Sequence, residues 1–283
     1  MIIQAKKGMV LVICLWLITI LAVFGIGLAR ISWTAYHFAR WKVNNFLALQ
    51  SVNTVILMSK FERMADETPE YDTLYELTPE SEYESENLKV VYSLIDEERK
   101  ININKAPSLI LKDLPSMDMD KAVEIVNSEY RPFSSKEELL LIEEIEKEDY
   151  DDIKDLITVY GEGQVNINTC SEEVLEALGV EEGVIASIMN FRKGEDDEEY
   201  TIDDGVFESP GGIIDTLTED FFLTMKEQQT LLSLITKNMV GVKSANYKLK
   251  ADVYVNDKLV DRYSVIIGRD NGAGKYHIRE WRK

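Results

Sequence analysis

Residues Met9–Ala29 read MVLVICLWLITILAVFGIGLA, a run of 21 residues without a charge. As an α-helix this run spans ~30 Å, which is the thickness of the hydrocarbon core of a bilayer. A cleaved secretory signal has a shorter apolar stretch, of roughly 7–15 residues, with an A-x-A-like cleavage site after it. No such site follows here. The sequence therefore predicts a retained transmembrane helix over residues 9–29.

The helical pattern continues beyond the apolar run. Residues 31–65 contain neither glycine nor proline, and apolar or aromatic residues recur there at mostly three- and four-residue steps. One helix over residues 9–65 would be ~85 Å long. We expect its first half to lie in lipid and its second half to pack on the rest of the protein. The recurring positions are Ile31, Ala35, Phe38, Val43, Phe46, Leu47, Leu49, Val52, Val55 and Ile56.

The charges divide the chain into a basic front and an acidic body. The 283 residues carry a formal net charge of −20, yet residues 1–64 hold seven basic residues against one acid. This division indicates a membrane anchor that carries a water-soluble domain. An acidic body repels phosphate backbones, which disfavours a general nucleic-acid binder. Basic residues stand on both sides of the apolar run, so charge bias alone does not orient the chain in the membrane.

A motif occurs twice in the middle of the chain. Ile101–Ala106 reads ININKA, and Val165–Cys170 reads VNINTC 64 residues later. Each copy predicts a helix, a tight hairpin and a second helix. We expect the asparagines to cap turns and the isoleucine between them to enter the core, with ligand contacts as the alternative. At this offset the aligned pairs are Leu111 with Leu175, Leu114 with Leu178, and Ala122 with Ala186.

The C-terminal residues change to a period of two. Apolar residues alternate with polar ones over Tyr247–Val255, and further strands are predicted over Leu259–Ile267 and from Tyr276 onward. The intervening turns are expected at Asn256-Asp257 and Asp270–Gly274, and Val90–Ile95 is a candidate for an additional strand. A three-strand meander needs cover on one face, and the amphipathic half of the long helix supplies it. The predicted class is α+β, with a long N-terminal helix packed on a small antiparallel sheet and an all-α domain inserted between them.

One loop is rich in carboxylates. Residues 194–205 read GEDDEEYTIDDG and hold six acids within nine residues. Hard oxygen ligands at mixed spacing suit Ca²⁺, although the spacing does not match an EF-hand loop. We take Asp196, Asp197, Asp203 and Asp204 as candidate calcium ligands, with a solvated acidic loop as the alternative.

The front of the chain resembles a type IV prepilin or pseudopilin. Lys6, Lys7 and Gly8 form a short basic leader ending in glycine, followed by Met9 and the apolar helix. The resemblance implies cleavage by a prepilin peptidase between Gly8 and Met9, and N-methylation of Met9. Most members carry a glutamate at the fifth mature position, which pairs with the amine of the neighbouring subunit towards the tip; here Ile13 stands there. A carboxylate in lipid is costly unless it is paired. A subunit with no neighbour above it has no partner for that charge, and an apolar residue then suits this position. With Ile13 there, the chain resembles the GspK family of minor pseudopilins.

The resemblance to the GspK family extends over the whole chain. It implies a subunit of type II secretion, held in the inner membrane with its soluble part in the periplasm. Its partners would be other minor pseudopilins at the tip of the pseudopilus, the major pseudopilin and the prepilin peptidase. Some GspK proteins bind calcium. The implied regions are a leader (1–8), a transmembrane helix (9–29), an amphipathic helix with the start of a pilin-like domain (30–95), an inserted α-helical domain (96–240) and a C-terminal antiparallel sheet (241–283).

The duplicated motif also resembles the helix-hairpin-helix units of membrane-anchored DNA receptors. In the DNA-binding version, a glycine-hydrophobe-glycine hairpin turns backbone N–H groups towards a phosphate. Here the hairpins read Ser116-Met117-Asp118 and Gly179-Val180-Glu181, and each acid would oppose a phosphate. We therefore expect no nucleic acid as a partner and keep a DNA receptor for uptake, or a minor pilin of a type IV pilus, as alternatives. No G-x-S-x-G or H-E-x-x-H motif occurs, and we expect no enzyme.

Overall fold

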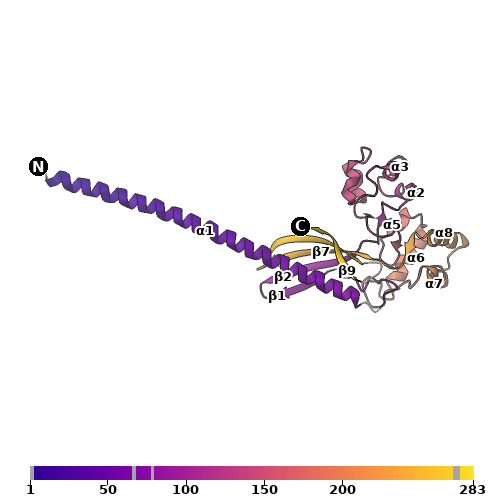
Figure 1. The fold of residues 1–283 in the computed structure, drawn as a ribbon. Coiled ribbons are helices and arrows are strands. Elements are labelled where there is room, and N and C mark those ends of the chain that lie inside the picture. The colour runs from indigo at the N-terminus through magenta and orange to yellow at the C-terminus, as the bar shows by residue number, and fades with distance from the viewer. Residues whose placement is uncertain (1–2, 66–67, 78–79, 270–274) are drawn as a thin grey trace.

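The longest element is a single helix, α1 (Ile3–Met64), of 62 residues. The computed structural model describes residues 3–65, 68–77, 80–269 and 275–283, so the turn expected at Asp270–Gly274 lies outside the described residues. The N-terminal half of α1 projects far from the rest of the molecule, and its C-terminal half lies along a sheet (Figure 1). The helix continues without a break because no proline interrupts it. The prediction of one long helix is confirmed.

The inner face of α1 packs on a five-stranded antiparallel sheet with the spatial order β1-β2-β7-β8-β9. Ala48, Val52, Val55 and Ile56 are at most 2% exposed and share a core with apolar residues of the sheet. The predicted α+β arrangement is confirmed. The strands are β1 (Ser81–Ser85), β2 (Leu88–Asp96), β7 (Asn246–Val255), β8 (Lys258–Arg269) and β9 (Tyr276–Arg282).

The sheet has two strands beyond the predicted meander. The candidate strand at Val90–Ile95 lies within β2, which pairs with β7 along its whole length. β1 was not expected, because its sequence SEYES lacks the apolar alternation of a half-buried strand. It pairs with β2 through its backbone and forms a mostly exposed edge, where polar residues hinder pairing with other chains.

The segment between β2 and β7 folds into helices around a core of its own, which the two motif copies share. Two short parallel strand pairs, β3–β4 and β5–β6, hold the start of each copy. The short strands are β3 (Ile101–Asn102), β4 (Ile157–Thr158), β5 (Val165–Asn166) and β6 (Val240–Gly241). The first copy contains α2 (Ser108–Leu111), α3 (Met119–Asn127), η1 (Lys136–Leu141) and α4 (Lys147–Ile153). The second contains α5 (Glu172–Ala177), α6 (Glu182–Arg192), η2 (Pro210–Gly212), α7 (Ile213–Phe221) and α8 (Met225–Thr236).

The second helices of the two copies do not keep the offset that separates the two motifs. Asp118 and Glu181 are the N-cap residues of α3 and α6, and they stand one residue closer together than the motif offset. Because the start of a helix sets which positions face the core, Ala122 is buried whereas Ala186 is exposed. The alignment of Ala122 with Ala186 is therefore wrong, and Ile185 takes the equivalent buried place.

The second asparagine of each motif copy holds the segment that follows the second helix of that copy. Asn104 Oδ1 accepts from the Phe133 N–H at 2.7 Å, and its Nδ2 donates to the Phe133 carbonyl at 2.9 Å. Asn168 makes the same pair of bonds with Phe207, at 2.9 and 3.0 Å. The first asparagine of each copy accepts from the N–H two residues further on. The expected turn role is confirmed, and these contacts are made within the chain.

Candidate functional site

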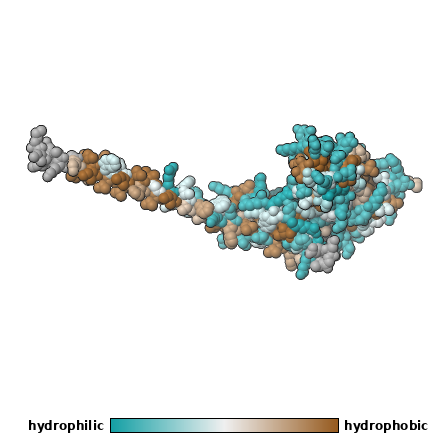
Figure 2. All heavy atoms as spheres, turned by 45° about the horizontal axis from the view of Figure 1, so that its top comes forward, coloured by the Kyte–Doolittle hydropathy of each residue, from teal (hydrophilic) through white to brown (hydrophobic). Residues whose placement is uncertain are grey.

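The apolar part of α1 lies outside the folded body. From Met9 onward, α1 is the one helix of the described residues that is long and apolar enough to cross a membrane. Its most apolar 18-residue window has a mean hydropathy of 2.9 and is not buried. Figure 2 shows apolar residues along the projecting helix and hydrophilic residues over the globular end. Ile13, at the position of the usual pilin glutamate, is 49% exposed on this helix.

The predicted peptidase site lies within the same helix. The backbone of α1 runs through the bond between Gly8 and Met9, and the side chain of Met9 is exposed. Cleavage at this bond and methylation of Met9 stay predictions.

A second exposed apolar surface lies on the part of α1 that covers the sheet. Leu57, Phe61 and Met64 are 67%, 71% and 58% exposed. A helix turns about 100° per residue, so these three positions share the side of α1 opposite the buried Val52 and Val55. We call them the outer stripe. Exposed apolar patches of this kind mark surfaces that contact partners or membranes.

Arg63 holds the C-terminal end of α1 against the body. Its Nη2 donates to the Glu76 carbonyl at 3.0 Å, and its Nη1 lies 3.6 Å from the Glu76 carboxylate and 4.0 Å from that of Asp72. The guanidinium also lies over the ring of Tyr247, 5.8 Å from its centroid. Phe61 and Met64 flank Arg63 in the last turn of α1, so these contacts hold that part of the outer stripe in place on the folded body.

Two buried carboxylates meet where α1, the sheet and the inserted helices join. Asn166 Nδ2 donates to Asp96 Oδ2 at 3.0 Å and to Asp72 Oδ2 at 3.3 Å. Tyr247 donates its hydroxyl proton to Asp72 Oδ1 at 2.7 Å, and Thr169 donates to Asp96 Oδ2 at 2.6 Å. We call Asp72, Asp96, Asn166 and Tyr247 the acidic junction. All four are at most 2% exposed, so the junction is structural and has no direct access to a ligand.

The acidic junction changes the protonation of its carboxylates. Burial raises the pKa of Asp72 to about 7, and the nearby charge of Asp96 adds to this, whereas the Tyr247 hydroxyl and Arg63 oppose it. Burial likewise raises the pKa of Asp96. The folded protein therefore holds a proton here at a pH at which an unfolded aspartate has lost it. This cluster was not predictable from the sequence, because its members come from four separate segments.

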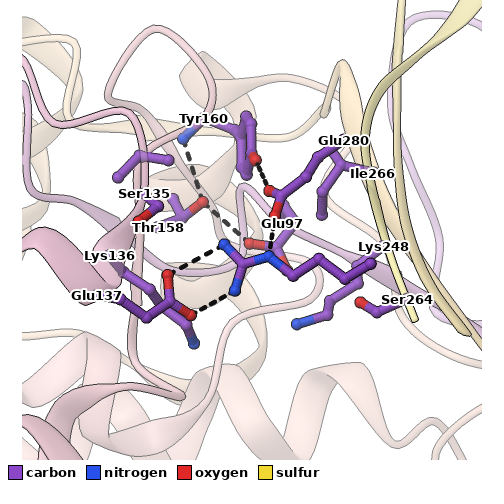
Figure 3. A pocket seen from close by; sticks show the side chains of 12 residues that line it. Glu97, Ser135, Lys136, Glu137, Thr158, Tyr160, Lys248, Ser264, Ile266 and Glu280 are labelled. Carbon is purple, nitrogen blue, oxygen red and sulfur yellow. Dashed lines mark hydrogen bonds and ion pairs between the residues drawn. The ribbon is translucent and has the colours of Figure 1, made fainter. Parts of the chain in front are cut away.

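The opposite face of the sheet meets the inserted helices along a charged seam (Figure 3). Arg282 on β9 donates to both carboxylate oxygens of Glu137 on η1, at 2.5 and 3.0 Å, and holds the pKa of Glu137 at about 2. Tyr160 donates its hydroxyl proton to the Glu280 carboxylate. A cavity of about 60 Å³ lies between these groups. The seam thus ties the last strand to the first motif copy.

The comparisons agree with this architecture. A chain of the crystal structure of the GspK-GspI-GspJ complex from the type 2 secretion system of enterotoxigenic Escherichia coli is similar, with a TM-score of 0.57 and 15% sequence identity. The similarity covers 85% of this chain and 98% of that chain. The chain has a GspK-like pseudopilin fold. No protein-family model matches the sequence, and no curated protein matches it.

The carboxylates of the acidic loop, residues 194–205, bond to the loop itself within this GspK-like fold. Asp203 accepts from the N–H of Asp196 at 3.2 Å, and Asp196 accepts in turn from an N–H further along. Asp204 accepts from two backbone N–H groups, and Asp197 lies 3.4 Å from Lys193 Nζ. Within the described ranges, no group of three or more histidine, cysteine or acidic side chains is arranged to hold a metal ion. Calcium binding by the four predicted ligands stays a prediction.

The calcium prediction is tested by thermal unfolding of the full chain with millimolar Ca²⁺ or with EGTA. If the loop binds Ca²⁺ as its composition predicts, the ion should raise the melting temperature by a few degrees at saturating concentration. The fourfold variant Asp196→Asn, Asp197→Asn, Asp203→Asn, Asp204→Asn should then show no shift. An equal shift in both proteins would place calcium elsewhere, and no shift in either would contradict the prediction.

Proposed function

We propose that this chain is a minor pseudopilin of a type II secretion system, which stands with other minor pseudopilins at the tip of a periplasmic pseudopilus. The proposal includes an anchor in the inner membrane through residues 9–29, and contact with the major pseudopilin below. The similarity to a chain of the GspK-GspI-GspJ complex supports it. Such a subunit has a structural role in the assembled pseudopilus. The prepilin peptidase would cleave the bond between Gly8 and Met9.

The position of the inserted helices is the observation that carries the proposal. They lie beyond the C-terminal end of α1, at the end of the molecule farthest from the apolar N-terminal half (Figure 1). If the apolar half lies in the membrane, the insert covers the surface on which a further subunit would stack. Ile13 agrees with this placement, because a subunit with nothing above it has no amine to pair with a carboxylate in lipid.

The outer stripe is the surface that we assign to lateral contact with a neighbouring minor pseudopilin. Leu57, Phe61 and Met64 lie on a helix whose other face is already buried, so they are free to contact a second long helix. Burying each such side chain stabilises a contact by roughly 1.5–3 kcal/mol. Apolar side chains at three- and four-residue steps are the usual anchors of helix-to-helix docking.

Replacing two residues of the outer stripe is expected to abolish the complex. In the variant Leu57→Asp, Phe61→Asp, two carboxylates would lie in the contact, while the fold should survive because both positions are exposed. The measurement is co-purification of the full chain in detergent with candidate minor pseudopilins. The control is Phe222→Asp, which changes a still more exposed apolar residue at the C-terminal end of α7 and should leave the complex intact.

The same samples separate the proposal from its alternatives. Full retention of the complex by the outer-stripe variant would contradict the assigned surface, and failure of every candidate partner to bind the unaltered chain would contradict the proposed class. A DNA receptor predicts a mobility shift of duplex DNA at low salt. We expect none, because Asp118 and Glu181 stand in the two hairpins, where a DNA-binding unit needs backbone N–H groups free to reach a phosphate.

A further inference from the structure

A second pocket, of about 320 Å³, lies beside the charged seam. It opens where the outward face of β7 meets the end of α4 and the start of α5. Its lining contains more cations than carboxylates, although the chain as a whole carries a net charge of −20. The charged lining residues are Arg99, Lys100, Lys248 and Lys250, against Asp155 and Glu173.

Three of these cations have no ionic partner in the described part of the chain. Lys100 Nζ is paired with Glu97 at 2.7 Å, and both side chains are buried. Arg99, Lys248 and Lys250 form no ion pair with any other described residue, although two carboxylates share the pocket. Burial lowers the pKa of Lys248; the charge of Glu97 opposes this, whereas the nearby charges of Lys100 and Lys250 add to it. Like charges are therefore held close together, and an anion placed among them would be stabilised.

The remaining lining is not suited to a bare inorganic ion. Ile95 and Leu156 are half-buried and supply apolar surface beside the cations. The hydroxyl oxygen of Ser171 is buried and makes no hydrogen bond within the described residues. A ligand with carboxylates, carbonyl or amide groups and apolar side chains would satisfy all three parts of this lining, and an acidic polypeptide segment has all three.

We propose that this pocket binds an acidic segment of a partner polypeptide, with its carboxylates against Arg99, Lys248 and Lys250 and its apolar side chains on Ile95 and Leu156. Because the chain as a whole carries a net charge of −20, contact of such a segment with most of the acidic body is disfavoured, and the pocket is the place of contact that we assign to it. The inference is independent of the proposed function, because it rests on the lining of the pocket and not on the outer stripe.

The test is fluorescence anisotropy of the full chain in nonionic detergent with a fluorescein-labelled peptide of alternating glutamate and leucine. Signal from empty micelles is subtracted. We expect the unaltered chain to bind the peptide, and the variant Arg99→Gln, Lys250→Gln to bind at least tenfold more weakly. The matched control Lys226→Gln, Lys258→Gln removes the same charge from exposed positions elsewhere and should bind as the unaltered chain does.

Four results would overturn the proposal. These are no binding by the unaltered chain, equal affinity in the two double variants, equal binding of a glutamine–leucine peptide, and displacement of the peptide by inorganic phosphate at equal concentration. The last result would assign the pocket to small anions. Because none of the substitutions lies on the outer stripe, these results are distinguishable from a failure of the proposed function.

Discussion

Replacing Asn168 by leucine is expected to lower the free energy of unfolding by about 4 kcal/mol and the melting temperature by about 10 °C. The side chain is buried, its Nδ2 donates to the Asp72 and Phe207 carbonyls, both at 3.0 Å, and its Oδ1 accepts from the Phe207 N–H. Leucine fills a similar volume but leaves three buried backbone groups without partners, and each such group costs roughly 1–3 kcal/mol. Urea or thermal unfolding of the full chain in detergent measures the loss.

The first motif copy offers the matched control for this prediction. Asn104 makes the equivalent bonds to Phe133, but its side chain is only half-buried, so water reaches part of the site. Asn104→Leu should therefore cost about 2 kcal/mol, clearly less than Asn168→Leu. Equal losses in the two variants would contradict the argument, because they would show that the deeper burial of the Asn168 contacts adds nothing to stability.

The elements with strong periodicity were predictable from the sequence. The long helix follows from an apolar run joined to a segment without glycine or proline, and β7 follows from the alternation of apolar and polar residues. β8 follows from an apolar segment rich in β-branched residues after the Asn256-Asp257 turn. β1 was not predictable, because SEYES has no buried face and owes its conformation to backbone pairing with β2. The register of the second helices was wrong by one residue, because Asp118 and Glu181 begin these helices at slightly different points of the repeat.

The buried polar groups were the least predictable part of the site. Asp72 lies in a segment with no periodicity, and its partners Asn166 and Tyr247 are far away in the sequence. Nothing local distinguishes such an aspartate from the many solvated acids of this chain. The duplicated motif gave the one sequence signal for this cluster, because it predicts that Asn166 and Asn168 are turn residues. The structure adds that the Nδ2 groups of both asparagines donate to Asp72.

The stability of the folded part is expected to fall as pH rises from about 5 to 8, by an amount of the order of 2 kcal/mol. The pKa of Asp72 is raised from an ordinary 3.8 to about 7 in the folded state. Because its pKa is raised, Asp72 binds a proton more tightly in the folded state than in the unfolded state. The stability gained in this way is fully present below the unfolded pKa and is lost as pH rises through the folded pKa. Asp96 and Glu98, whose pKa values are also raised by burial, act in the same direction. Urea unfolding at a series of pH values measures the slope.

Two amide substitutions test whether the acidic junction causes this slope. Asp72→Asn should flatten it and be at least as stable as the unaltered chain at pH 8, because the new Nδ2 can donate to the Tyr247 hydroxyl, which in turn donates to the Ser244 carbonyl 3.0 Å away. Asp96→Asn should be destabilising at every pH. Both oxygens of Asp96 accept from donors, with the Glu98 N–H on one side and Asn166 on the other, so an amide nitrogen must face one of them. A slope unchanged in Asp72→Asn would show that Asp72 is not the titrating group.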